Sequence, residues 1–122
     1  MDRDVAAELH ELHARVCKAI ADPKRLLIIN ELRDRELSVG DLCESLELTQ
    51  SNVSQHLAIL RERGVVAARR EGTSVIYSLR GTKVLAAVDL LREFLAEDLT
   101  DRARLSHSLG DSTVAVEDRP VG

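Results

Sequence analysis

The sequence predicts a mainly α-helical domain that carries one small β-hairpin. Hydrophobic residues recur at spacings of three and four over most of the chain, which is the period of an amphipathic helix. Two short segments, 65–70 and 74–79, flank Glu71-Gly72-Thr73, an arrangement typical of two strands joined by a tight turn. Aromatic residues make up only 2% of the chain, so the core must consist of aliphatic side chains, which suits helices.

Size and charge narrow the class of protein. The chain has 122 residues, of which 44% are hydrophobic, and this fits one domain. A small core with few large side chains is marginally stable, so burial of more surface in a dimer is expected. The net charge of −4 argues against a protein that coats nucleic acid without selectivity. Between residues 49 and 70, however, only Glu62 is acidic, against the basic residues Arg61, Arg63, Arg69 and Arg70.

The chain lacks the features of a membrane or secreted protein. No apolar run approaches the ~20 residues that a membrane span requires. The N-terminal residues are charged and do not resemble a secretory signal. We therefore expect a cytoplasmic protein that binds no membrane. Cys17 and Cys43 are then expected to be reduced thiols and not a disulfide.

The first two helices are expected on either side of Asp22-Pro23. Residues 4–21 form a helix because Val5, Leu9, Leu12, Val16 and Ile20 make one apolar stripe. Proline disfavours helical backbone in the residue before it, whereas Asp22 suits the N-cap of a second helix that has Pro23 at its first position. This helix, 23 to about 35, is apolar over a wide arc and is expected to be the central core helix; its apolar residues are Leu26, Leu27, Ile28, Ile29 and Leu32.

Two short capped helices follow. Ser38 and Asp41 form a capping-box pattern at the start of the third helix. Thr49 caps the fourth, which ends at Gly64, the usual residue for a left-handed C-terminal cap. The faces expected to be buried are Val39, Leu42 and Leu46 on the third helix and Val53, Leu57 and Leu60 on the fourth.

A long helix is expected from about Thr82, after the hairpin. Its apolar stripe needs a partner, either the first helix or a second subunit; it consists of Val84, Leu85, Val88, Leu91, Leu95 and Leu99. The sequence predicts one folded domain over 1–109. Residues 110–122 lack periodicity, and we expect them to be a disordered C-terminal tail.

The predicted order, α-α-α-α-β-β-α, is that of a winged helix-turn-helix. The fourth helix has an apolar inner face and small polar residues on its first turns, as expected of a helix that reads base edges in the DNA major groove. The residues expected to contact DNA are Gln50, Ser51, Asn52, Ser54, Gln55 and His56 on this helix, and Arg69, Arg70, Thr73 and Ser74 on the hairpin. The alternative for these positions is a solvated helix face and a merely polar hairpin tip.

Three segments resemble the ArsR/SmtB family of bacterial repressors. Residues 18–32, with Ala-Asp-Pro-Lys-Arg-Leu at their centre, are similar to the family's "D-P-x-R-L" opening. Residues 53–65 resemble its "V-S-x-H-L-x-x-L" recognition helix, and residues 69–79 resemble its wing. The resemblance covers roughly residues 9–99, in order and with the family's spacing. It implies a homodimer, paired through its first and last helices, that represses transcription on an inverted-repeat operator in double-stranded DNA and is released by an inducer.

The inducer is left open by the sequence. Ser38 and Gly40 stand where the family's thiolate sensors have cysteines, and the last helix lacks the histidines of its zinc and nickel sites. His10, His13 and Cys17 lie at i, i+3 and i+7 on the first helix and are candidate partial ligands for a metal ion, completed by another element. Cys17 and Cys43 are candidate thiol sensors. The simpler alternatives are core or half-buried cysteines and solvated histidines.

No enzyme is expected, because the chain lacks a glycine-rich phosphate loop, a nucleophile–base pair and a plausible carboxylate pair. No cofactor is assigned beyond a metal ion or a thiol modification as the inducer. Two other functions stay open. One is a winged helix that binds a protein partner, and the other is a DNA-binding repressor without a sensor site. The basic hairpin tip favours DNA.

Overall fold

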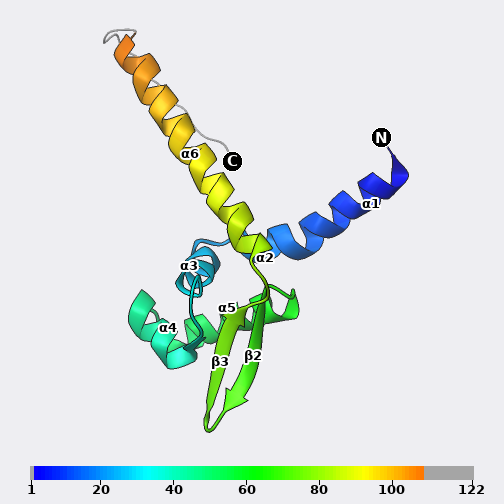
Figure 1. The fold of residues 1–122 in the computed structure, drawn as a ribbon, viewed down its shortest axis with the longest axis vertical. Coiled ribbons are helices and arrows are strands. Elements are labelled where there is room, and N and C mark those ends of the chain that lie inside the picture. The colour runs from blue at the N-terminus through cyan, green and yellow to red at the C-terminus, as the bar shows by residue number, and fades with distance from the viewer. Residues whose placement is uncertain (1, 109–122) are drawn as a thin grey trace. The chain divides into compact units, whose positions relative to one another are not determined.

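A computed structural model describes residues 2–108 of the chain (Figure 1). Its contacts divide the chain into a first unit that ends at Leu85 and a second that begins at Ala86, and each is described by itself. The elements in chain order are α1 (Arg3–Leu12), the π-helical turn η1 (His13–Cys17), α2 (Lys18–Ile20), α3 (Pro23–Glu31), β1 (Leu37–Ser38), α4 (Val39–Leu46), α5 (Gln50–Glu62), β2 (Val66–Glu71), β3 (Ser74–Leu79) and α6 (Lys83–Ser108). The predicted class, mainly helical with a small hairpin, is confirmed.

The first predicted helix is present but is not uniform. It runs from Arg3 to Ile20 and contains a π-helical turn at His13–Cys17. A π-helical turn is wider than an α-helical one, so residues beyond it leave the face that α-helical spacing assigns to them. Nothing in the structure explains why the turn forms here. The apolar residues before it are 40–48% exposed; they are Val5, Leu9 and Leu12.

The break at Asp22-Pro23 is confirmed. The Asp22 carboxylate accepts hydrogen bonds from the backbone N–H groups of Lys24 (2.8 Å) and Arg25 (3.2 Å), which caps α3. This helix ends at Glu31, about a turn before the predicted end at residue 35. The chain leaves the helix there because residues 37 and 38 pair with β3 at the sheet edge.

Helix α3 contributes to the core as expected, but only part of its wide apolar arc is buried. Ile28 and Ile29 are fully buried and Leu32 nearly so. Leu26 and Leu27, by contrast, are 36% and 48% exposed. A short helix in contact with α2, α4 and α5 has neighbours on part of its circumference only, so the remaining apolar residues face outward.

The two capped helices of the predicted helix-turn-helix are confirmed. The Ser38 side chain accepts from the Asp41 N–H (3.1 Å), and the Asp41 carboxylate accepts from the Ser38 N–H (3.3 Å), which completes the capping box of α4. Thr49 Oγ1 accepts from the Asn52 N–H (3.2 Å) at the start of α5. Gly64 ends this helix with a φ of +81°, a conformation that glycine adopts without strain.

The sheet has three antiparallel strands in the order β1-β3-β2. Glu71 pairs with Ser74, so the turn consists of Gly72 and Thr73 alone and Glu71 belongs to the strand. The prediction placed Glu71 in the turn and omitted β1. Two residues carry too little pattern to be recognised as a strand, and their pairing partners, Tyr77 and Ile76, are far along the chain.

The core of the first unit is aliphatic, as the composition predicts. It contains residues from α2 to the start of α6: Ala19, Ile28, Ile29, Leu32, Leu37, Leu42, Val53, Leu57, Leu60, Val65, Val66 and Leu85. Within residues 2–108 no polar or charged side chain is buried.

The long last helix is confirmed and runs from Lys83 to Ser108. Six of its large hydrophobic side chains are at least half exposed: Leu90, Leu91, Phe94, Leu95, Leu99 and Leu105. None of the helices over residues 2–108 combines the length and apolar character needed to cross a membrane. The tail expected at 110–122 lies outside the described residues.

The cap of α3 predicts how stability depends on pH. Burial raises the pKa of Asp22, but hydrogen bonds from the Arg25 and Lys24 N–H groups and the nearby charges of His56 and Arg25 outweigh it, and the pKa is lowered from 3.8. A lowered pKa in the folded state gives stability that is fully present above pH 3.8 and is lost as the pH falls through the folded value.

Asp22→Asn should therefore change the free energy of unfolding little at neutral pH, because asparagine is as good an N-cap as aspartate. Between about pH 5 and pH 3 the variant should lose less stability than the wild type, since the titrating group is gone. Urea unfolding across this range measures the difference. Asp34→Asn, at an exposed loop position, is the control. Parallel pH profiles for wild type and Asp22→Asn would contradict the account.

Candidate nucleic-acid interface

Helix α5 separates its buried and exposed residues as the sequence predicts. Val53, Leu57 and Leu60 are completely buried against the core. On the first two turns Gln50, Ser51, Ser54 and Gln55 are exposed, and Asn52 and His56 are half-buried. The predicted base-reading side chains are thus exposed or half-buried together on the first two turns of one helix. Amide and hydroxyl groups of this kind match the donors and acceptors of base edges in the major groove.

His56 is held by a residue that the sequence analysis did not single out. Nδ1 of His56 lies 3.2 Å from the Arg25 NH1 group, which comes from α3. The same guanidinium donates from Nε to the Ala19 carbonyl and from NH2 to the Lys18 carbonyl (3.3 Å). These carbonyls belong to the end of α2, where helical carbonyls lack partners within the helix. Arg25 therefore links α2, α3 and α5.

A second polar link holds the helix-turn-helix to α3. Glu31 accepts hydrogen bonds from the Ser45 hydroxyl (2.5 Å) and from the Arg35 guanidinium (2.7 Å). The Ser45 hydrogen bond is the larger cause of a lowered pKa for Glu31, and Arg35 adds to it against the opposing effect of burial. Because Ser45 is on α4, this contact helps fix the helix that precedes α5.

The two arginines of the hairpin differ. Arg69 pairs with Glu36 (2.6 Å) and with Glu71 (3.4 Å), and hydrogen bonds to these carboxylates, Glu36 first, raise its pKa. Arg70 is exposed and has no ion pair or hydrogen bond from its side chain to any residue within 2–108. Successive residues of a strand point to opposite faces, which explains the contrast.

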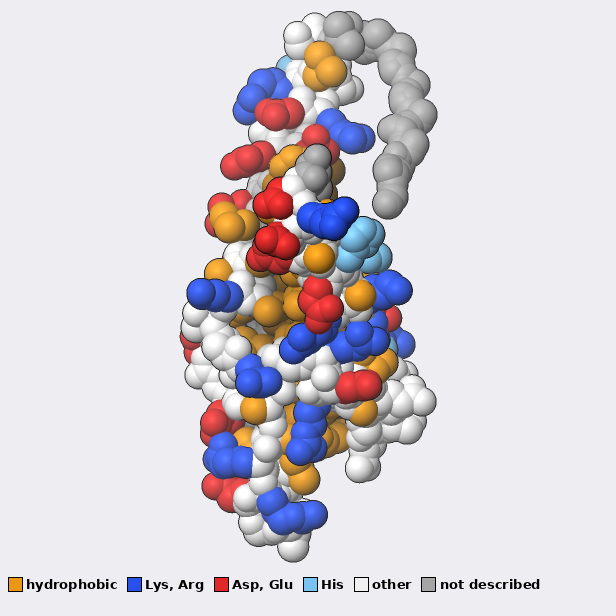
Figure 2. All heavy atoms as spheres, turned by 90° about the vertical axis from the view of Figure 1, so that its right-hand side faces the viewer, with side chains coloured by type: hydrophobic (Ala, Val, Ile, Leu, Met, Phe, Trp, Pro, Cys, Tyr) orange, Lys and Arg blue, Asp and Glu red, His pale blue; other side chains and the backbone are white. Residues whose placement is uncertain are grey.

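Thr73 in the turn and Ser74 at the start of β3 are exposed. Figure 2 shows both basic and acidic side chains around the hairpin, at the bottom of the view. The hairpin is therefore not a uniformly basic surface. The Arg70 side chain is free to pair with a phosphate, whereas the charge of Arg69 is already balanced by Glu36 and Glu71.

The structure does not gather the candidate ligands His10, His13 and Cys17 into a three-ligand group within residues 2–108, so a site completed by another element stays a prediction. No group of three or more His, Cys, Asp or Glu side chains among residues 2–108 is placed to hold a metal ion. His13 and Cys17 are the first and last residues of the π-helical turn, so the α-helical spacing that grouped them with His10 does not hold there. Cys17 is exposed, Cys43 is half-buried against the core, and both are free thiols.

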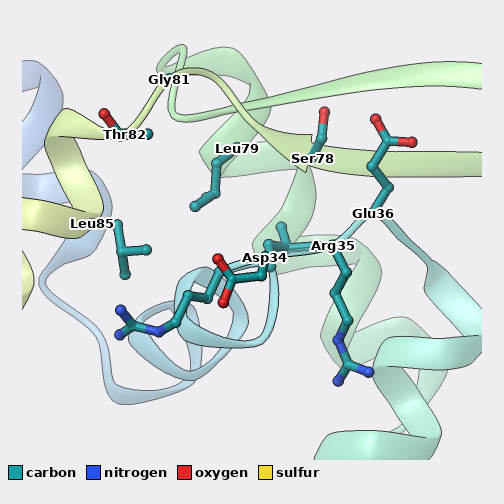
Figure 3. A pocket seen from close by; sticks show the side chains of 10 residues that line it. Asp34, Arg35, Glu36, Ser78, Leu79, Gly81, Thr82 and Leu85 are labelled. Atoms are coloured by element: carbon teal, nitrogen blue, oxygen red, sulfur yellow. The ribbon is translucent and has the colours of Figure 1, made fainter.

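An open groove lies between the end of α3 and the base of the hairpin (Figure 3). Leu79 and Leu85 face each other across it, whereas the side chains of Arg35 and Glu36 point away. Those two charged groups are engaged elsewhere, with Glu31 and Arg69 respectively. The lining is mixed: Asp34, Ser78 and Thr82 accompany the leucines, and the Asp34 carboxylate lies toward the middle of the groove (Figure 3).

The chain is similar to known regulatory proteins. The sequence model described as bacterial regulatory protein, arsR family, matches residues 22–68. The HTH-type transcriptional regulator Rv0081 of Mycobacterium tuberculosis is 40% identical over 102 residues, which are 83% of this chain and 90% of the relative. Its crystal structure has a TM-score of 0.70 at 41% identity and covers 78% of this chain and 96% of that one.

Two further proteins show the same similarity. The transcriptional activator HlyU of Vibrio cholerae is 48% identical over 80 residues, 66% of this chain and 74% of the relative. The solution structure of Mb0332 from Mycobacterium bovis has a TM-score of 0.70 at 32% identity, with 81% of this chain and 91% of that one covered. It is described as a homodimeric winged helix-turn-helix DNA-binding domain.

Proposed function

This chain belongs to the arsR family of bacterial regulatory proteins and is a transcriptional regulator, and we propose that it acts as a homodimeric repressor on an inverted-repeat operator. The observation that carries the proposal is the exposed polar face of α5. Its inner residues are fully buried, so the helix presents Gln50, Ser51, Ser54 and Gln55 outward from a rigid support. Regulators bind DNA by placing such a helix in the major groove.

The hairpin supplies the second contact in this proposal. Arg70 is an exposed cation on β2, close in sequence to the turn residue Thr73 and to Ser74, the first residue of β3. A wing of this kind binds phosphates or the minor groove and positions the reading helix without specifying sequence. Arg69 contributes less, because a phosphate would have to displace two carboxylates from its guanidinium.

Exposed apolar residues support the dimer. Val5, Leu9 and Leu12 of α1 are exposed on one helix, and six large hydrophobic side chains of α6, from Leu90 to Leu105, are 54–66% exposed. Apolar surface on this scale marks an interaction site in a small protein. Two copies that pair through their first and last helices would bury these residues and present two reading helices related by a twofold axis. The homodimeric state described for Mb0332 supports this assembly.

The direct test is a mobility-shift assay with the duplex that lies upstream of the chain's own gene. We expect a specific complex that forms on this duplex and not on a scrambled one of equal length. A reporter driven by the same region should be repressed when the protein is supplied. No complex in the first assay would overturn DNA binding, and an increase in reporter output would overturn repression in favour of activation, the role given to HlyU.

Gln55→Ala should lower the preference for the cognate site by about 1–3 kcal/mol, because glutamine forms paired hydrogen bonds with a base. Competition between cognate and scrambled duplexes measures this preference. Glu62→Gln, at the exposed C-terminal turn of the same helix, should leave it unchanged. An equal loss of affinity for both duplexes would remove Gln55 from base reading.

Arg70→Ala should weaken binding to every duplex and reduce the slope of log affinity against log salt by about one, since one phosphate contact is lost. Arg69→Ala should reduce the slope less, because its guanidinium is already paired. Fluorescence-anisotropy titrations at several salt concentrations give both slopes. The account of the wing fails if Arg69→Ala produces the larger change.

Leu95→Glu should convert the dimer to a monomer and abolish tight binding to an inverted repeat, because it places a charge in the buried interface. Ala96→Glu is the matched control, since the next residue points about 100° away around the helix. Sedimentation equilibrium measures the mass of each variant. A wild-type chain that sediments as a monomer, or a dimeric Leu95→Glu variant, would contradict this interface.

A further inference from the structure

The contact between Arg25 and His56 joins two segments that are 31 residues apart in the chain. Arg25 is the arginine that follows the Asp22-Pro23 helix start, and His56 is on the second turn of α5. The guanidinium cannot move freely, because it also donates to two carbonyls at the end of α2. Its NH1 group is therefore held in a fixed position beside the histidine ring.

The chemistry of the two groups decides which ring nitrogen carries hydrogen. An arginine guanidinium has only donors and keeps its charge at any ordinary pH. Nδ1 of His56 must then be the acceptor, with its lone pair directed at Arg25. In a neutral imidazole one nitrogen carries the hydrogen, so the hydrogen of His56 is on Nε2. Nε2 lies on the other side of the ring from the Nδ1 lone pair, so Arg25 does not engage it, and His56 is only half-buried.

We propose that Arg25 is a positioning residue for DNA binding: it fixes His56 as the Nε2–H tautomer, so that the ring presents one oriented N–H donor to a DNA phosphate. The proposal rests on the proposed function. A phosphate is the expected acceptor because a single donor is enough for a phosphate oxygen, whereas discrimination between bases uses paired hydrogen bonds. His56 thereby complements the exposed amides of the first turns, which read the bases.

The tautomer can be measured without DNA. Long-range ¹H–¹⁵N spectra of the full chain at about pH 8, where imidazole is neutral, distinguish the two ring nitrogens. We expect Nε2–H in the wild type and in Lys24→Gln, which removes the neighbouring charge but keeps the contact. Arg25→Lys should give a mixture of tautomers. Nδ1–H in the wild type would overturn the proposal, and this result does not depend on whether any variant folds.

The effect on DNA is measured by a double-mutant cycle. Asparagine retains an acceptor near the position of Nδ1 but lacks the outer donor, so His56→Asn should weaken binding about tenfold on cognate and scrambled duplexes alike. His56→Gln, whose amide reaches further out, should lose less. Arg25→Lys should weaken binding in the wild type but add little in the His56→Asn background, whereas Lys24→Gln should have the same small effect in both.

The outcomes separate the possible errors. Equal losses from Arg25→Lys in both backgrounds would show that Arg25 acts independently of His56 and would overturn the proposal. A loss confined to the cognate duplex would overturn the phosphate assignment. If the wild type binds no duplex, the proposed function fails together with the DNA part of this inference, and the ring spectra still decide whether Arg25 sets the tautomer.

Discussion

Three side chains of α5 lose all contact with water when the helix packs on the core, and this burial determines what the helix presents outward. Val53, Leu57 and Leu60 are each fully buried, and burying one such side chain contributes about 1.5–3 kcal/mol. A rotation of the helix by one residue would expose them and bury amides without partners. Gln50, Ser51, Ser54 and Gln55 are therefore held outward by the burial of these three side chains, and His56 is in addition held by Arg25.

Polar contacts at the edge of the core then fix the position of this helix. The Asp22 carboxylate caps α3, Arg25 joins that helix to α2 and α5, and Glu31 joins it to α4 through Ser45. All of these groups are partly exposed, so their net energies are small. They act chiefly by selecting one arrangement among those that bury the same aliphatic residues.

Features that depend on local sequence were predicted best. The caps at Asp22, Ser38 and Thr49 and the glycine at residue 64 follow from backbone preferences that neighbouring residues reveal, and the structure confirms each. The exposed and buried sides of α5 follow from helical spacing. The family was inferred correctly because motifs in three segments occur in order.

Features that depend on distant parts of the chain were missed. Strand β1 forms by pairing with β3, which is about 40 residues further along the chain. The same pairing draws residues 37 and 38 to the sheet, so α3 ends earlier than its sequence predicts. The neutralisation of Arg69 by Glu36 joins residues 33 apart, and the contact of Arg25 with His56 joins residues 31 apart. Such pairs leave no periodic pattern in the sequence. Arg69 and Arg70 were therefore both expected to contact DNA, and no role was expected for Arg25.

Chemical-shift mapping of the ¹⁵N-labelled chain with the duplex upstream of its own gene tests the central claim most directly. The account predicts that the amides with the largest chemical-shift changes lie in residues 50–56 and 70–74. A scrambled duplex should shift the same amides by smaller amounts. Perturbations confined to other surfaces of the chain, with α5 unchanged, would contradict it.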